Sequence, residues 1–285
     1  MDTRASARMK RPLKIALSIV FVVVIAFVVA RVFWPKPGHK PPAAKVVVKK
    51  KPAAKPAAAQ PSQQHPHMAI ILDDWGASGV HVDEALAVGR PLTLAIIPHL
   101  RSSQQVAEEA HTHGLGVMLH MPMQPKNRRA SEPHAIQTTM ADGDIRQLLD
   151  SALASIPYVE GVNNHQGSAA TSDLRVMTTV LSHLKSKGLF FIDSKVIAAS
   201  VGLEAAKKTG IRFASRDVFI DNVATVAAVK EQIQKAITVA RTHGEAVVIG
   251  HDKSPTLEAL REMVPEIEKN GIKLVLVKDI VTVRA

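Results

Sequence analysis

The sequence predicts an α/β fold, an irregular (β/α) barrel of seven or eight strands in residues 68–285. From Met68 onward, helical stretches repeatedly end at a glycine, and a short apolar stretch follows within one or two residues. The apolar stretches lack the alternation of half-exposed strands, which indicates parallel strands covered on both faces. The repeated βα units suit a single barrel, with a doubly wound open sheet as the alternative.

Five glycines mark the ends of the expected helices, because glycine adopts the left-handed conformation that closes a helix. They are Gly114, Gly188, Gly210, Gly244 and Gly271. The expected strands cover residues 68–73, 92–97, 115–120, 158–163, 189–193, 211–214, 246–250 and 273–277. In this assignment "YVEGV" is a buried strand, and the polar "NNHQGS" begins the loop that follows it.

An apolar run precedes the barrel. Residues 15–34 are long and apolar enough to cross a bilayer, and residues 1–14 form a basic flank. They predict a single-pass anchor in the inner membrane, with the C-terminal domain on the periplasmic side. A cleaved signal peptide is the alternative, since "VVA" at residues 28–30 resembles a cleavage site. Residues 35–67 are rich in Pro, Ala and Lys and predict a disordered linker.

The net charge of +11 belongs to this N-terminal part. Residues 1–67 contain 13 Lys and Arg and one acid, which leaves 23 basic and 24 acidic residues in the barrel region. A nucleic-acid-binding domain would carry its positive charge on the fold itself, so we expect no nucleic-acid partner. The absence of cysteine excludes disulfides and thiolate ligands.

Polar residues end most of the expected strands. In barrels of parallel strands the active site lies at the carboxyl ends of the strands, where the βα loops meet. The candidate residues on this rim, besides "NNHQGS", are Asp73, Asp74, His99, His120, Asp193 and His251. So many polar strand ends on one rim are difficult to explain by packing alone.

Two adjacent carboxylates and several imidazoles on one rim fit a divalent metal site. Aspartate and histidine suit zinc, and three protein ligands with one open position are typical of catalytic sites. Such an ion activates a water molecule and polarises a carbonyl group. Structural alternatives stay open: Asp73 and Asp74 could cap the turn at Gly76, His120 could be a core histidine, and His165 could orient its own loop.

Six segments together resemble the divergent polysaccharide deacetylase family. They are "AIILDDWG", "LHMPMQP", "GVNNHQGS", "FFIDS", "VFIDN" and "VVIGH", and the resemblance covers about residues 68–280. The family is related to the NodB-homology carbohydrate esterases of the glycoside hydrolase/deacetylase superfamily. The resemblance implies an irregular (β/α) barrel and a hydrolase that acts on carbohydrate.

The resemblance also implies roles for individual residues. Asp73 matches the base of the esterases, Asp74 and His120 match metal ligands, and His251 matches the acid. The second histidine of the esterases falls at Gln124, and their arginine-containing motif on the fourth strand is replaced by "NNHQGS".

His165 is therefore expected to supply the missing imidazole as a third metal ligand. Asn163 and Asn164 would orient this loop or contact substrate, and Asp193 is a further candidate for substrate binding.

Three functions compete at this point. The first is a membrane-tethered, metal-dependent hydrolase of envelope carbohydrate that removes acetyl groups from an amide (C–N bond) or an ester. Its substrate would be a polysaccharide or peptidoglycan-type glycan, and its expected metal is a divalent ion such as zinc. Asp73 would take a proton from water, and His251 would protonate the leaving amine. The second is an inactive cell-envelope protein that binds or scaffolds. The third is a glycosidase that uses two carboxylates, such as Asp73 and Asp193.

Overall fold

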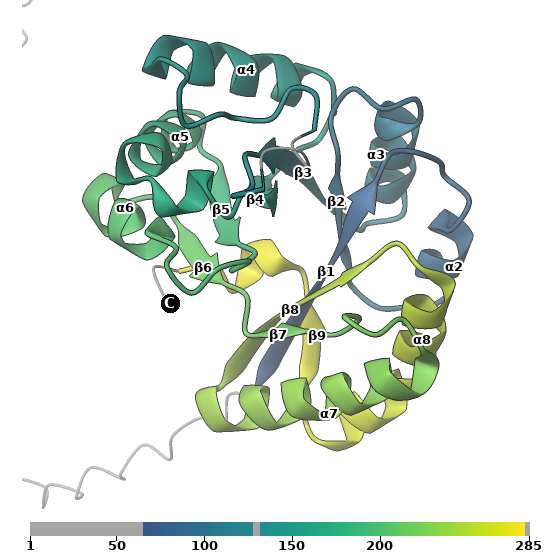
Figure 1. The fold of residues 1–285 in the computed structure, drawn as a ribbon. Coiled ribbons are helices and arrows are strands. Elements are labelled where there is room, and N and C mark those ends of the chain that lie inside the picture. The colour runs from purple at the N-terminus through teal and green to yellow at the C-terminus, as the bar shows by residue number, and fades with distance from the viewer. Residues whose placement is uncertain (1–64, 128–131, 283–285) are drawn as a thin grey trace, which may run out of the picture. The chain divides into compact units, whose positions relative to one another are not determined.

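The computed structural model describes residues 65–127 and 132–282. Within this part, parallel strands form one curled sheet, and the α-helices lie outside it (Figure 1). The strands are β1 (His67–Trp75), β2 (Thr93–Ile96), β3 (Gly116–Met123), β4 (Gly161–Gln166), β5 (Phe190–Asp193), β6 (Phe213–Ser215), β7 (Val218–Phe219), β8 (Glu245–His251) and β9 (Lys273–Val275). The structure thus confirms a parallel, barrel-type α/β fold, although the described sheet has nine strands rather than seven or eight.

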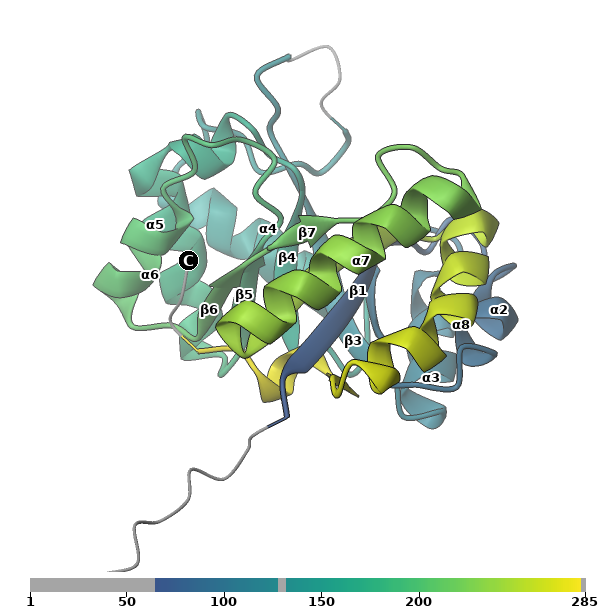
Figure 2. The same ribbon diagram turned by 90° about the horizontal axis from the view of Figure 1, so that it is seen from below.

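Helices connect most of the strands and cover the sheet from outside, as Figures 1 and 2 show. The α-helices are α2 (Val82–Leu86), α3 (Ser103–Thr112), α4 (Asp142–Ala154), α5 (Leu174–Ser186), α6 (Gly202–Thr209), α7 (Val226–His243) and α8 (Ser254–Lys269). There are also two short 3-10 helices in the described part, η2 (Ala170–Ser172) and η3 (Val277–Asp279), and Val277 of η3 packs inside the curled sheet. The five glycines expected at helix ends all have positive φ angles, between 70° and 84°. The expected relation between glycine and helix end is therefore correct.

The strand order is β6-β5-β4-β3-β2-β1-β8-β7, and β9 pairs with β1. β1 lies at the centre, because it pairs with β8 along one edge and with β9 and then β2 along the other. The two ends of this order, β6 and β7, are separated in the chain only by Arg216 and Asp217. The N–H of Arg216 donates to Asp193 O and that of Asp217 to Val247 O. This short link therefore joins the β5 side of the sheet to the β8 side.

Two apolar clusters lie on the two faces of the sheet. The larger cluster packs the strands against the helices, and the smaller cluster fills the inside of the curled sheet. The inner cluster contains alternate strand residues such as Ile71, Met118 and Ile249. Val277 and Ile280, which follow β9, belong to the same cluster. The C-terminal segment therefore contributes to the packing inside the curled sheet. The polar residues that the sequence singled out follow the last of these inward-facing apolar residues along each strand.

The prediction for the fourth strand was wrong by three residues. β4 begins at Gly161 and runs to Gln166, so "NNHQ" belongs to the strand and not to a loop. Tyr158, expected inside the strand, has a positive φ of 64° and a relative exposure of 51%. Side chains alternate along a strand, so consecutive polar side chains of "NNHQ" point to opposite faces of the sheet.

The expected anchor at residues 15–34 and nearly all of the expected linker lie outside the described residues. Among residues 65–127 and 132–282, no helix combines the length and apolar character needed to cross a membrane.

Candidate metal centre

The polar side chains of the site continue the inward-facing rows of the strands. Along β1, β3 and β8 the inner cluster contains Ile71, Met118 and Ile249, and the next inward position on each strand is polar. These positions are Asp73, His120 and His251, and β4 adds Asn163 and His165. The pairing places Asp73 beside His251 and His120 beside Asn163 at the carboxyl ends of the strands.

A bulge in β1 adds the second carboxylate. Between Leu72 and Trp75, β1 has one residue more than the matching stretch of β2. Asp74 has a φ of 69°, a conformation that aspartate adopts more readily than most residues. The extra residue explains how two consecutive carboxylates, Asp73 and Asp74, both approach the histidines of the site.

Three ligand-type atoms form a small triangle. Asp74 Oδ1 lies 3.0 Å from His165 Nδ1 and 3.3 Å from His120 Nε2, and the two nitrogens are 3.0 Å apart. Asp74, His120 and His165 are also the one group in the described part of the chain whose atoms could together hold a metal ion. They are the three residues that the sequence predicted as metal ligands, although His165 lies on a strand rather than in a loop.

The outer nitrogen of each ring has a partner that orients it. His120 Nδ1 lies 2.8 Å from Asn163 Oδ1, and the amide of Asn163 donates to Asp73 Oδ1 at 2.8 Å. His165 Nε2 lies 2.9 Å from the carboxylate of Glu132. Because these oxygens accept, each outer nitrogen carries the hydrogen, and the lone pair of the inner nitrogen points into the triangle.

The triangle fits a divalent ion in its dimensions and in its hydrogen bonding. Ligands about 2.0–2.1 Å from a tetrahedral ion lie roughly 3.3–3.4 Å from one another. The observed separations of 3.0, 3.0 and 3.3 Å are close to this. Asp74 Oδ1 is buried and forms no hydrogen bond of good geometry. Metal-binding histidines also commonly donate their second N–H to a carboxylate or carbonyl oxygen, as His120 and His165 do here.

The charges at the triangle favour a cation. Burial alone would raise the pKa of Asp74, but its contacts with His120 and His165 hold that pKa well below the usual aspartate range. Burial opposes protonation of His165, yet Asp74 and Glu132 outweigh it and raise the pKa of His165 above its usual value. A carboxylate that stays ionised among imidazoles is stabilised by positive charge at this point.

Asp73 lies beneath the triangle and is almost completely buried, with a relative exposure of 2%. Its Oδ2 is 3.7 Å from His120 Nε2, and its Oδ1 accepts from Asn163. Burial raises the pKa of Asp73 above its usual value, although His120 and Asn163 oppose the shift. Asp73 is therefore a better proton acceptor near neutral pH than an exposed aspartate.

His251, which pairs with Asp73 on the neighbouring strand, also lies beside the triangle. Its Nε2 is 3.7 Å from Asp74 Oδ2, and its Nδ1 is 2.8 Å from Asp221 Oδ1. The buried carboxylate of Asp221 also accepts from the backbone N–H of His251 and from Thr256 Oγ1. Burial lowers the pKa of His251, but Asp221 and then Asp74 outweigh it and raise that pKa above its usual value. The ring is thus held in place and favours its protonated form.

Comparison with known proteins now identifies the family, because residues 70–281 match the sequence model described as divergent polysaccharide deacetylase. The chain belongs to this family. Two relatives in the comparison are the uncharacterized protein YibQ of Escherichia coli, 32% identical over 197 residues, and an uncharacterized protein of Haemophilus influenzae, 35% identical over 194. The matches cover 69% and 68% of this chain, and 62% and 69% of the relatives. The match thus spans less than two thirds of the E. coli protein.

A solved structure shows the same fold. The crystal structure of an uncharacterized protein of Agrobacterium tumefaciens superposes with a TM-score of 0.72 at 21% sequence identity. The superposition covers 77% of this chain and 91% of that protein. The likeness supports the architecture of this divergent polysaccharide deacetylase domain, and the chemistry has to be argued from its own residues.

The two asparagines of β4, Asn163 and Asn164, lie in different surroundings. Asn163 is fully buried between His120 and Asp73 and contacts both of them. Asn164 points to the other face of the strand, where its amide donates to Gln166 O and its oxygen accepts from the N–H of Ser194. These contacts fit a positioning role, which is one of the two roles predicted for both residues, in the site for Asn163 and in the strand ends for Asn164. A contact with substrate stays a prediction for both.

The carboxylate of Asp193 accepts hydrogen bonds from the segment that follows β5. One carboxylate oxygen accepts from the N–H of Lys195 at 2.8 Å and the other from Ser200 Oγ at 2.5 Å. The residue is 2% exposed. Both carboxylate oxygens of Asp193, the last residue of β5, therefore bind the segment between β5 and α6, and its contact with substrate stays a prediction. A glycosidase that uses Asp73 and Asp193 would need this carboxylate free.

Sequence reasoning missed two partners of the site and the role of a third residue. Glu132 lies in the long segment between β3 and α4, where no pattern singles it out. Asp221 follows the two-residue β7, and the quoted "VFIDN" contained it without a role. Gln124, at the position of the second family histidine, accepts from the N–H and Oγ1 of Thr138. Its side chain therefore holds the β3–α4 segment, while His165 completes the triangle.

Proposed function

We propose that this chain is a metal-dependent hydrolase that removes acetyl groups from N-acetylated glycans of the cell envelope. The observation that carries the proposal is the grouping of Asp73, the triangle and His251 at one end of the barrel. Membership of the divergent polysaccharide deacetylase family supports a deacetylase-like activity. Zinc is the ion that the ligand types favour.

The residues divide into three roles. Asp74, His120 and His165 would hold the ion, which when bound supplies Lewis acidity toward a carbonyl oxygen and lowers the pKa of a water molecule. Asp73 accepts a proton from the attacking water, whose oxygen bonds to the acetyl carbon. His251 donates a proton to the amine nitrogen as the C–N bond breaks, so that acetate and a free amine are the products.

The pKa directions agree with these roles. A general base works best when its pKa approaches the working pH, and burial shifts Asp73 in that direction. A general acid has to be protonated before it acts, and Asp221 and Asp74 favour protonated His251. Asp73→Asn should therefore keep the metal and lose turnover, because Asp73 lies outside the triangle.

Acetate release by the full-length chain tests this function. The assay uses chitin-type oligomers and peptidoglycan-type glycan strands, before and after a chelator and after addition of zinc. We expect release that the chelator abolishes and zinc restores. His183→Ala is a matched control, because its imidazole pairs with Asp150 away from the site. A metal-loaded chain that releases no acetate from either glycan would contradict the hydrolase and favour an envelope-binding protein without catalysis.

We also propose that residues 15–34 anchor the chain in the inner membrane and place the barrel outside the cytoplasm. The basic flank before this apolar run supports that orientation. Protease added to intact spheroplasts should remove the barrel domain. A domain that stays protected until the cells are lysed would contradict the orientation.

A further inference from the structure

Arg216 lies near the site, but it has no part in the proposed deacetylase mechanism. It lies in the link between β6 and β7, and its N–H donates to Asp193 O at the end of β5. Ala214, two residues earlier, belongs to the inner apolar cluster. Since alternate residues of a strand share a face, Arg216 continues the inward row to the level of the site.

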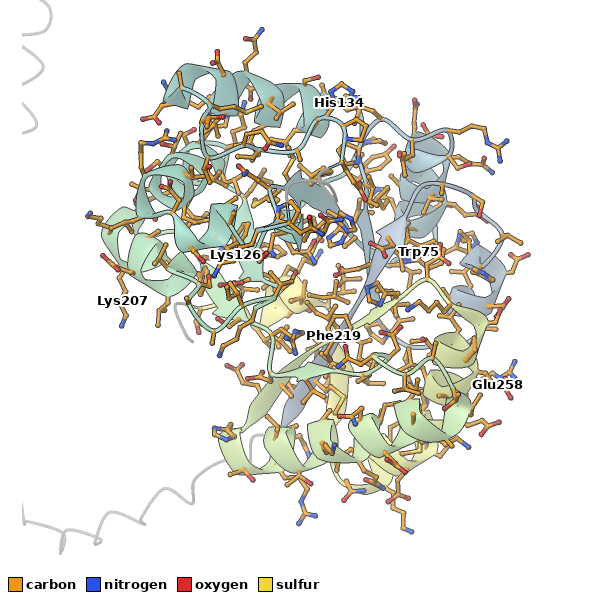
Figure 3. The ribbon with its side chains drawn as sticks, viewed as in Figure 1. Trp75, Lys126, His134, Lys207, Phe219 and Glu258 are labelled. Carbon is orange, nitrogen blue, oxygen red and sulfur yellow. The ribbon has the colours of Figure 1, made fainter. Side chains whose placement is uncertain are left out.

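Neutral groups hold the guanidinium of Arg216 in place. Its Nε donates to Ser194 O at 2.8 Å, and its Nη2 donates to Lys195 O at 3.1 Å. The guanidinium carbon also lies 5.0 Å from the centre of the ring of Phe219, a residue of β7 that Figure 3 labels. Two hydrogen bonds and an aromatic ring thus fix the plane of the group.

No carboxylate pairs directly with this cation. Within residues 65–127 and 132–282, no carboxylate oxygen lies within 4.0 Å of the Arg216 nitrogens, and no hydrogen bond from its Nη1 is found. Asp193, Asp73 and Asp217 interact with its charge only at longer range. A half-buried guanidinium usually has an anionic partner. The side chain therefore retains donors and charge for an incoming anion.

The position suits an anion that is part of the substrate. The ring of Phe219 lies 5.1 Å from the ring of His251, with an interplanar angle of 70°. The guanidinium carbon is therefore at most 10.1 Å (5.0 plus 5.1 Å) from the centre of the His251 ring. Substituents of one sugar, or of two adjacent sugars, can span such a distance. An anionic group there would bind while the acetamide faces His251 and Asp73.

We propose that Arg216 binds a carboxylate of the substrate, so that the site selects N-acetylated glycans with an acidic substituent over neutral chitin-type glycans. The proposal rests on the proposed deacetylase function and adds the substrate class. Guanidinium groups bind carboxylates through two parallel hydrogen bonds, which gives direction as well as affinity. The carboxylate could belong to a lactyl ether, as in muramic acid, or to a neighbouring uronic acid.

Matched glycans test the proposal on the full-length, metal-loaded chain. The set contains a neutral N-acetylglucosamine oligomer, one with lactyl ether carboxylates, the same compound with the carboxylates converted to amides, and one with uronic acids. The variants are Arg216→Gln and Arg216→Lys, with Arg212→Gln as a control, since Arg212 is an exposed arginine over a different ring, that of Phe190. Acetate release gives kcat/KM, and calorimetry gives Kd without any need for turnover.

For the unmodified chain, we expect the ratio of kcat/KM for an acidic glycan over its amide to be roughly tenfold to hundredfold, as a charge-assisted hydrogen bond provides. Arg216→Gln should reduce this ratio to about one, Arg216→Lys should keep part of it, and Arg212→Gln should leave it unchanged. The glycan with the larger ratio identifies the source of the carboxylate. No preference in the unmodified chain, or an equal loss on acidic and amide glycans in Arg216→Gln, would overturn the proposal and indicate a structural role.

The binding data separate this proposal from the deacetylase function. If no glycan releases acetate but the acidic glycan binds more tightly than its amide in an Arg216-dependent way, the deacetylase function fails and the carboxylate site stands. If acetate is released without an Arg216-dependent preference in kcat/KM or Kd, the function stands and the carboxylate site fails.

Discussion

Two imidazole–carboxylate pairs face each other across Asp74, and they differ in what the inner nitrogen meets. His165 is paired with Glu132, and its inner nitrogen lies 3.0 Å from both Asp74 Oδ1 and His120 Nε2. His251 is paired with Asp221, and its inner nitrogen is 3.7 Å from Asp74 Oδ2, outside the triangle. In the proposed mechanism, the same pairing therefore prepares one imidazole as a metal ligand and the other as a proton donor.

The carboxylates of the two pairs differ as well. The Asp221 side chain is fully buried and accepts three hydrogen bonds, whereas the Glu132 side chain is 38% exposed in the β3–α4 segment. A buried carboxylate with several donors fixes the adjacent ring firmly, and a half-exposed one does so less. The comparison teaches that the position of the inner nitrogen, and not the pairing itself, assigns the chemistry.

His165→Ala should have the largest effect on activity, because it removes a corner of the triangle. We expect acetate release to fall by about 10³-fold or more, and added zinc should not restore it, since both water activation and carbonyl polarisation are lost. The control His183→Ala should keep the activity. An active His165→Ala chain would mean that His165 is not a ligand.

His251→Ala should act through the proton and not through the metal. We expect kcat to fall by about 10²–10⁴-fold at saturating zinc, the usual contribution of a positioned general acid. Substrates with a better leaving group, such as an activated aryl acetate ester, need less protonation and should lose less. An equal loss on amide and activated ester would contradict the role as acid.

Asp221→Asn should have a smaller effect on rate and a measurable effect on stability. The change weakens the support of His251 and disturbs three hydrogen bonds to a buried group. We expect kcat to fall on the order of tenfold to hundredfold and the free energy of unfolding to fall by about 1–3 kcal/mol. Asp150→Asn, at an exposed pair with His183, is the control and should change neither quantity appreciably.

Glu132→Gln should have the smallest effect of the four. Loss of the carboxylate behind a metal-binding histidine typically weakens metal affinity by about 10–100-fold. Activity at saturating zinc should therefore stay near that of the unmodified chain, while the zinc concentration needed for half activity rises. Unchanged zinc dependence would show that Glu132 does not support His165.

The sequence was sufficient for the architecture because the relation between glycine-ended helices and apolar strands is local. It also indicated Asp73, Asp74, His120, His165 and His251, since each lies at a strand end. It could not indicate the bulge in β1, which depends on pairing with β2. A misplaced start of β4 hid the alternation of Asn163 and Asn164, and with it their different surroundings.

Contacts between distant segments explain the remaining differences. Asp193 is the last residue of β5 and Asp73 lies near the end of β1, yet the loop that follows β5 occupies both oxygens of Asp193. Glu132 and Asp221 approach the site only after the chain has folded, from the β3–α4 segment and from beyond β7. A polar strand end therefore predicts a site residue only when its face and its remaining hydrogen-bonding capacity are known.

The metal content of three chains tests the central claim most directly. The full-length protein, His165→Ala and His251→Ala are purified without chelator, dialysed against the same low zinc concentration, and measured for zinc per chain. The account predicts one zinc in the unmodified chain and in His251→Ala, and none in His165→Ala, with all three chains folded by circular dichroism. Equal zinc content in His165→Ala and the unmodified chain, or loss of zinc only in His251→Ala, would contradict the triangle as the metal site.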